Sequence, residues 1–122
     1  MSPARGGGLP GMTFTSVLAQ ATVSDLRAAE PWYTALLDRG PDARPMDGLL
    51  EWRVSDGGGV QVWAEPERAG RSTVLLATDD LDAVAARLAA SGTATRGIER
   101  GGGARLLRLT DPDGTRVVLL GR

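Results

Sequence analysis

Two hairpin-like segments of the same design, 55 residues apart, constrain the fold of this chain more than any other feature. The later segment, residues 106–120, has runs rich in Leu and Val on either side of Asp111-Pro112-Asp113-Gly114. Pro presets φ and Gly accepts a positive φ, so this composition predicts a β-hairpin. The earlier segment, residues 52–63, has the same arrangement around Asp56-Gly57-Gly58-Gly59. The spacing indicates one supersecondary unit used twice.

The remaining predicted elements repeat in the same order in both halves. The strands predicted from alternation and turn signals cover residues 14–23, 43–46, 49–54, 60–64, 72–78, 95–99 and the two arms of the closing hairpin. Helices are predicted over residues 26–39 and 81–91, each after an N-cap aspartate, Asp25 or Asp80. Pro31 does not suit a helix interior, so we expect the first helix to start nearer Ala28 or to bend, and Gly40-Pro41 to stop it.

The chain length predicts a single domain over residues 13–122. Its two modules occupy about residues 13–64 and 72–121, and the charged, turn-rich residues 65–71 link them. Residues 1–12 are rich in Gly and Pro, which predicts a flexible arm; the alternative is an arm that packs on a partner subunit.

Composition excludes several classes of function. The chain has no His and no Cys, so it lacks the side chains for Ser-His-Asp or Cys-His catalysis and for imidazole or thiolate metal sites. A formal net charge of −1 gives no electrostatic basis for nucleic-acid or membrane-surface binding. No apolar run approaches the roughly 20 residues of a membrane span. We therefore expect a cytoplasmic protein.

Three motifs, taken together, resemble one known superfamily. They are Val-Ser-Asp-Leu at residues 23–26 before a helix with Trp32-Tyr33, Thr-Asp-Asp-Leu-Asp-Ala at residues 78–83, and Asp-Pro-Asp-Gly-Thr-Arg-Val-Val-Leu at residues 111–119. Their order and spacing resemble the vicinal oxygen chelate superfamily of glyoxalase I, bleomycin resistance proteins, fosfomycin-inactivating enzymes and extradiol dioxygenases. The resemblance implies an α+β fold in which two tandem βαβββ modules form a curved, partly open eight-stranded barrel around a ligand cavity. It also implies a homodimer.

The metal enzymes of that superfamily place one ligand on the first and the last strand of each module. The corresponding positions in this chain are Leu18, Gln61, Thr73 and Val118. Only Gln61 is an ordinary metal ligand, and a catalytic divalent ion needs about three protein ligands to compete with water. We therefore predict neither a metal nor another cofactor, and we do not expect the metal-dependent activities of the superfamily.

Strand alternation assigns side chains to two faces of each sheet. One set is apolar and should be covered by the helices: Val17, Ala19, Ala21, Leu50, Trp52, Val54, Val60, Val62, Val74, Leu76, Leu107, Leu109, Val117 and Leu119. The other set should line the concave side: Leu18, Gln20, Leu49, Glu51, Arg53, Gln61, Trp63, Thr73, Leu75, Leu106, Arg108, Arg116, Val118 and Leu120. Apolar side chains with a few polar groups suit a small organic ligand.

Within the concave set we predict ligand binding by two amides, three guanidinium groups and an indole: Gln20, Gln61, Arg53, Arg108, Arg116 and Trp63. Trp63 can stack on a flat ligand, and an arginine can hold a carboxylate or phosphate in a fork. Alternatively, Trp63 fills the barrel mouth or a dimer seam, and the arginines pair with Glu51 or reach solvent. Glu51 is the candidate catalytic residue, because an apolar cavity raises the pKa of a carboxyl group; the alternative is a salt bridge with Arg53 or Arg108.

These observations lead to three hypotheses. The first is a metal-independent protein that binds a small organic ligand and sequesters a drug or metabolite, as resistance proteins do. The second is an enzyme, a glyoxalase-like lyase or isomerase that uses Glu51 with an arginine as electrophile, either metal-free or with unusual ligands. The third is a structural or regulatory dimer whose cavity is packed shut by Trp63 and the leucines.

Overall fold

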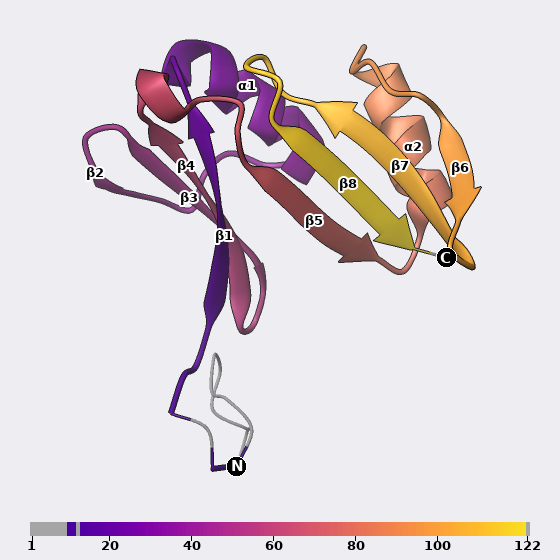
Figure 1. Cartoon of the computed structure of the whole chain (residues 1–122), viewed down its shortest axis with the longest axis horizontal. Coiled ribbons are helices and arrows are strands. Elements are labelled where there is room, and N and C mark those ends of the chain that lie inside the picture. The colour runs from indigo at the N-terminus through magenta and orange to yellow at the C-terminus, as the bar shows by residue number, and fades with distance from the viewer. Residues whose placement is uncertain (1–9, 12, 122) are drawn as a thin grey trace.

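A computed structural model describes residues 10–11 and 13–121, so the predicted arm lies almost wholly outside the described residues. The chain forms two four-stranded sheets side by side, each with its own helix (Figure 1). No strand of one sheet pairs with a strand of the other in the described part, so the sheets do not close into a barrel. No helix of that part is long and apolar enough to cross a membrane.

The two sheets have the same topology. The first has the order β1-β4-β3-β2 and contains β1 (Val17–Val23), β2 (Ala43–Met46), β3 (Leu49–Ser55) and β4 (Gly58–Ala64), with helix α1 (Leu26–Leu37). The second has the order β5-β8-β7-β6 and contains β5 (Thr73–Thr78), β6 (Ile98–Gly101), β7 (Ala104–Thr110) and β8 (Arg116–Gly121), with helix α2 (Leu81–Ala90). A 3₁₀ turn, η1 (Pro66–Arg68), lies between them. In each sheet the first strand is parallel to the last and the other pairs are antiparallel, which confirms the duplicated βαβββ unit.

The first helix starts where the N-cap signal lies. The Asp25 carboxylate accepts the Arg27 N–H (2.9 Å), and the helix begins at Leu26, so the expected start nearer Ala28 was wrong. Pro31 lies inside the helix and has no N–H to donate to the Arg27 carbonyl one turn earlier. Both residues are exposed, so water can donate to that carbonyl instead. Asp38, in the left-handed conformation at φ 62°, ends the helix before the predicted stop.

Two predicted strands are displaced. β1 begins at Val17 instead of residue 14, because the register pairs Val17 with Gly58 at the start of β4 and leaves residues 14–16 without a partner strand. β6 occupies residues 98–101 instead of 95–99. The positive φ of Gly97 (77°) interrupts the extended chain there.

Each helix covers one face of its own sheet. Ten of the fourteen strand residues predicted for that face are buried: Ala21, Leu50, Trp52, Val60, Val62, Val74, Leu107, Leu109, Val117 and Leu119. The other four are exceptions. Ala19 and Leu76 are half-buried, and Val17 and Val54, near the ends of their strands, are 77% and 45% exposed. The Trp52 indole N–H donates to the Arg39 carbonyl (2.8 Å), which satisfies the one polar atom of this core side chain.

The turn between β7 and β8 joins the second half of the chain to the first. Oδ2 of Asp111 accepts a hydrogen bond from the Tyr33 hydroxyl on α1 (2.8 Å). Oδ1 accepts the backbone N–H groups of Asp113 and Thr115 (2.9 Å each). The Asp113 carboxylate accepts the backbone N–H (2.9 Å) and the hydroxyl (2.6 Å) of Ser24. The turn predicted from its Pro and Gly is thus also the main polar contact between the two modules.

Arg87 on α2 makes a second link between the halves. Its guanidinium donates to the carbonyls of Ala35 (2.6 Å) and Leu36 (2.9 Å) in the last turn of α1. These carbonyls have no partner within the helix, and a cation is favoured at this end of the helix dipole. The two modules therefore meet through satisfied polar groups as well as through a shared core.

Tyr33 makes the junction sensitive to high pH. Burial, together with the hydrogen bond to Asp111, raises the pKa of Tyr33 above its ordinary value of about 10. The folded state therefore favours the neutral phenol, so this contribution to stability is complete below pH ~10 and is lost as the pH rises beyond it. The chain has one Tyr, no Lys and no Cys, so no other side chain ordinarily titrates between pH ~9 and ~11.5. We predict that tyrosinate absorbance appears only together with unfolding.

Tyr33→Phe is the matched variant. It should cost about 1–3 kcal/mol of unfolding free energy at neutral pH, because Asp111 loses a buried donor, and it should abolish the fall in stability above pH ~10. Denaturant titrations of both proteins across this pH range measure the difference. A Tyr33 that ionises with an ordinary pKa in the folded protein contradicts the prediction.

Candidate functional site

The face of each sheet turned away from its helix is open. The open face of the first sheet carries Leu18, Gln20, Glu51, Arg53, Gln61 and Trp63, and that of the second carries Leu75, Leu106, Arg108, Arg116, Val118 and Leu120. Leu18 is 39% exposed and Leu75 is 59% exposed. Leu49 was predicted for the same face but is buried, because Trp63 lies directly opposite it in the register.

Three polar side chains form a hydrogen-bonded row across the first open face. The register places Gln61 between Gln20 on β1 and Glu51 on β3. The Gln61 amide donates from Nε2 to Oε1 of Glu51 (2.9 Å) and accepts at its own Oε1 from Nε2 of Gln20 (3.1 Å). An ionised carboxylate can only accept, so Glu51 fixes the direction of donation along the row. Each amide of the row has a second N–H, and the row also has acceptor oxygens, so it suits a ligand with polar groups of either kind.

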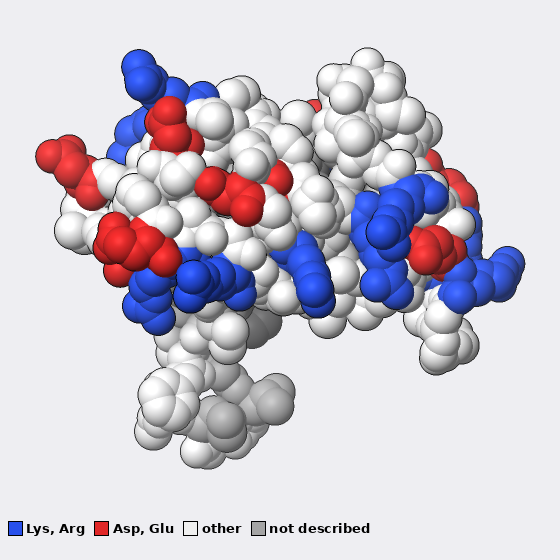
Figure 2. All heavy atoms as spheres, turned by 45° about the horizontal axis from the view of Figure 1, so that its top comes forward, with Lys and Arg blue, Asp and Glu red and all other residues white. Residues whose placement is uncertain are grey.

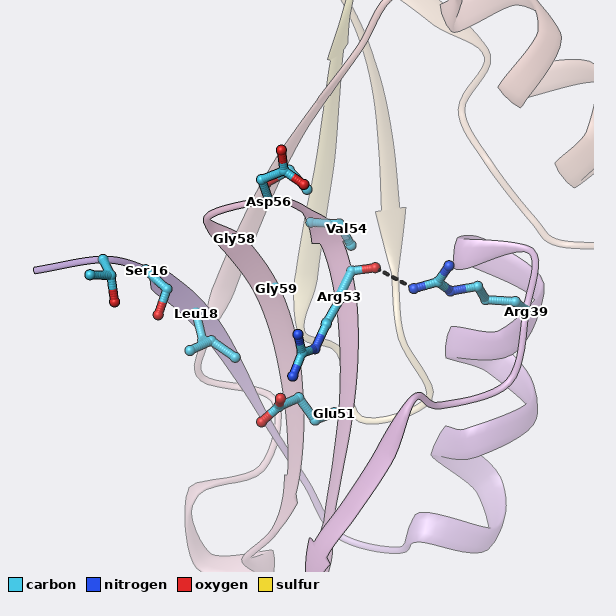
Figure 3. A pocket seen from close by; sticks show the side chains of 11 residues that line it. Ser16, Leu18, Arg39, Glu51, Arg53, Val54, Asp56, Gly58 and Gly59 are labelled. Atoms are coloured by element: carbon cyan, nitrogen blue, oxygen red, sulfur yellow. Dashed lines mark hydrogen bonds between the residues drawn. The ribbon is translucent and has the colours of Figure 1, made fainter. Parts of the chain in front are cut away.

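A cavity of about 580 Å³ lies beside this row. Figure 3 shows Leu18 on one side of it and the side chains of Glu51 and Arg53 on the other, with Asp56 at the turn. The described residues contain no salt bridge to Glu51, whose hydrogen-bond partner is Gln61. Charged and hydroxyl groups surround Glu51, so the apolar cavity expected around it is not found, and its catalytic role stays a prediction.

The residues between α1 and β2 fix the backbone of Arg53. The Arg39 guanidinium donates to the Arg53 carbonyl (2.7 Å) and to the Asp42 carboxylate (2.6 Å), and this carboxylate accepts the Arg53 N–H (2.7 Å). The hydrogen bonds from the Arg53 N–H and from Arg39 lower the pKa of Asp42. Sequence analysis missed Arg39 and Asp42, because no periodicity connects a loop with the strand beside which it folds.

A second cavity, of about 530 Å³, lies on the second open face. Arg108, Arg116 and Val118 line it, together with Thr110 and Arg96, which the sequence analysis did not select. Extending the alternation of β7 by one step beyond Arg108 finds Thr110. Arg96 lies in the loop before β6, where no periodic signal marks it.

The structure therefore divides the predicted site residues into two groups. Gln20, Glu51, Gln61 and Arg53 come together on the first sheet, and Arg108 and Arg116 come together on the second. Trp63 is half-buried on β4 and lines neither of these two cavities. A third cavity, of about 590 Å³, lies between the modules and is lined mainly by apolar side chains, among them Leu37, Val54 and Leu75.

The donor set does not fit a catalytic metal ion. Leu18 and Gln61 lie on the first sheet, Thr73 and Val118 lie on the second, and both ends of the Gln61 amide are engaged by Gln20 and Glu51. Residues 10–11 and 13–121 contain no group of three or more His, Cys, Asp or Glu side chains able to hold a metal. One neutral amide cannot replace the hydration shell of a divalent ion.

The sequence pattern of the glyoxalase/bleomycin resistance protein/dioxygenase superfamily matches residues 15–119. The chain belongs to this superfamily. The match begins before β1 and ends within β8, and it confirms the resemblance carried by the three motifs and the α+β fold of paired modules. Solved structures of similar proteins can therefore be compared with this chain.

Solved structures show the same fold over nearly the whole chain. A glyoxalase/bleomycin resistance protein from Catenulispora acidiphila is 29% identical, with a TM-score of 0.81 over 88% of this chain and 97% of the other. TnmS3, an antibiotic binding protein from Streptomyces sp. CB03234, is 28% identical, with a TM-score of 0.75 over 90% and 98%. A bleomycin-binding protein complexed with bleomycin is similar in fold, at 19% identity and a TM-score of 0.73 over 88% and 98%. No curated protein matches the chain.

Proposed function

We propose that this protein binds a small organic ligand on its open faces without a metal, and that it sequesters a drug or metabolite in the manner of resistance proteins. The observation that carries the proposal is the exposure of apolar side chains beside ordered polar groups. Leu18 and Leu75 remain 39% and 59% exposed next to the Gln20–Gln61–Glu51 row and the arginines of the second sheet. Uncovered apolar surface rimmed by polar groups is typical of a binding site.

The similar structures support a binding role. TnmS3 is described as an antibiotic binding protein, and another protein of the same fold was solved with bleomycin. The cavities on both open faces favour binding over the hypothesis of a cavity packed shut by Trp63 and leucines.

We assign each kind of side chain a different contact with the ligand. We assign stacking on a flat ligand to Trp63, whose half-buried indole lies on the same strand as Gln61. Gln20 and Gln61 are assigned to hydrogen bonds with the ligand's polar groups. Arg53, Arg108 and Arg116 are assigned to its acidic groups. The enzymatic alternative depends on Glu51, since the other carboxylate on the open faces, that of Glu99, lies beside Arg108.

Trp63 provides the direct test. A panel of flat aromatic natural products, neutral and charged, should contain compounds that quench the tryptophan fluorescence saturably. Trp63→Phe should remove most of this quenching and weaken binding about two- to fivefold, because the smaller phenyl ring keeps only part of a stacking energy of about 0.5–1.5 kcal/mol. Fluorescence titration and calorimetry measure both quantities.

Trp32→Phe is the matched control. Trp32 lies on α1, on the helix side of the first sheet, with its ring centroid 4.8 Å from that of Tyr33. This variant should bind the same compounds unchanged. Absence of saturable binding across the panel, or equal losses in both variants, contradicts the proposal.

We also propose that the protein is a homodimer in which a second copy covers part of the exposed apolar surface. Leu75, Val54 and Met46 are 59%, 45% and 58% exposed, and Leu75 and Val54 border one cavity between the modules. Contiguous apolar surface of this kind is typical of an interaction site. Light scattering after size exclusion should give twice the chain mass of 12.7 kDa, and Leu75→Glu should shift the mass toward one chain. A wild-type protein that stays monomeric at micromolar concentration contradicts this proposal.

A further inference from the structure

We infer that the cavity of the second sheet is an oxyanion site, which takes the carboxylate or phosphate group of a small organic ligand. We call it the oxyanion cavity and define it by Thr95, Arg96, Arg108, Thr110, Arg116 and Val118. The inference rests on the proposed function, because it names the chemical class of a ligand bound on the open faces. It adds Arg96, Thr95 and Thr110 to the binding residues.

The strand register brings two of the arginines together. Arg108 on β7 pairs with Val118 on β8, and Thr110 pairs with Arg116. Arg108 and Arg116 are therefore diagonal neighbours on one face of an antiparallel pair. The Cα atoms of such neighbours are roughly 7–8 Å apart in a typical sheet. One carboxylate or phosphate between them can accept from both guanidinium groups. Arg96 approaches the same space from the loop that precedes β6.

The charge of the cavity is only partly neutralised from within the protein. Six arginines elsewhere lie within 4.0 Å of a carboxylate: Arg27, Arg39, Arg44, Arg68, Arg87 and Arg105. Within residues 13–121 no salt bridge joins Arg96 or Arg116 to an acidic side chain, which is also true of Arg53, Arg71 and Arg100. Figure 2 shows basic side chains over both halves of the molecule, with acidic side chains among them. Unpaired arginines around one hollow favour an anionic occupant.

Arg108 has one acidic neighbour, and the contact leaves its donors available. Its Nε lies 3.5 Å from Oε2 of Glu99, and this oxygen is buried without any hydrogen-bond partner in the described residues. Among the described residues, the two terminal nitrogens of Arg108 donate no hydrogen bond. Three guanidinium groups therefore face the charge of a single carboxylate, and the excess of positive charge favours an oxyanion over a neutral group.

Hydroxyl and apolar groups complete the cavity. The Thr95 hydroxyl oxygen accepts the Gly97 N–H (3.1 Å), which leaves its proton free to be donated toward the cavity. Thr110 is exposed beside Arg116 and offers a second hydroxyl. Val118 supplies apolar surface. A volume of about 530 Å³ exceeds what an inorganic anion needs and lies in the range of drug-sized ligands, so the anion is expected to carry an organic body.

The equivalent place on the first sheet has the opposite character. Glu51 pairs with Gln61 as Arg108 pairs with Val118, so a carboxylate in one module corresponds to a guanidinium in the other. On the first sheet Glu51 repels an anionic group while Arg53 attracts it, whereas on the second sheet Arg108 and Arg116 both attract it. The acidic end of a ligand is therefore directed to the second sheet.

Phenyl phosphate, benzoate and neutral benzyl alcohol test the inference on the full chain, with inorganic phosphate as the probe for the anion alone. Calorimetry should show binding in the order phenyl phosphate, benzoate, benzyl alcohol, with inorganic phosphate weaker than phenyl phosphate. Arg96→Gln and Arg116→Gln should each weaken phenyl phosphate binding about tenfold, because each removes a charge-assisted hydrogen bond. Raising the salt from about 0.05 to about 0.5 M should also weaken it.

Arg100→Gln is the matched control, because Arg100 is an exposed arginine on β6 of the same sheet and does not line the cavity. It should bind phenyl phosphate within about twofold of the wild-type protein. Equal losses in Arg100→Gln and Arg116→Gln overturn the inference, as does phenyl phosphate binding no tighter than benzyl alcohol. If the anions fail to bind while flat neutral compounds still quench Trp63, the oxyanion cavity is wrong and the proposed function stands. If neither class binds, both proposals fail.

Discussion

The buried hydrogen bond from Tyr33 to Asp111 is central to the junction of the two halves, where Ser24 and Arg87 make further contacts. One carboxylate closes the turn between β7 and β8 through two backbone N–H groups and accepts the phenol of α1 with its other oxygen. Because α1 covers the first sheet and β8 carries Arg116 and Val118, this bond fixes the relative position of the two open faces. A carboxylate 4% exposed is tolerable only because each oxygen has donors. The Asp111 carboxylate therefore both shapes the turn and connects the two modules.

Duplication produced two similar scaffolds whose open faces differ in chemistry. The amide row of the first sheet corresponds to Leu75, Val118 and Arg108 of the second. Such a pair of faces can recognise different ends of one ligand, hydrogen-bonding groups on the first and an acidic group on the second. The superfamily's metal positions are occupied by groups that cannot coordinate strongly, so affinity must come from apolar burial, stacking and charge-assisted hydrogen bonds.

Sequence alone predicted the duplicated unit, because hydrophobic alternation, N-cap aspartates and the Asp-Pro-Asp-Gly turn are local signals with local physical causes. It placed Trp52 in the core and Gln61 on the open face for the same reason. The sequence-based prediction failed where a residue distant in the chain determines the structure. β1 starts later than predicted because its partner β4 starts at Gly58, and Leu49 is buried because Trp63 lies opposite it on the neighbouring strand. The Arg39–Asp42 contact with β3 and the approach of Arg96 to β8 depend on loop paths that no periodicity encodes.

The most direct measurement of the central claim, that the open sheet faces are the binding surface, is residue-resolved NMR during titration with a flat acidic aromatic compound such as anthraquinone-2-sulfonate. The account predicts that amide and side-chain signals of β4, β7 and β8, including the indole N–H of Trp63, shift saturably. The signals of α2 should stay in place. Saturable shifts confined to the helices, with the strand signals unchanged, contradict the account.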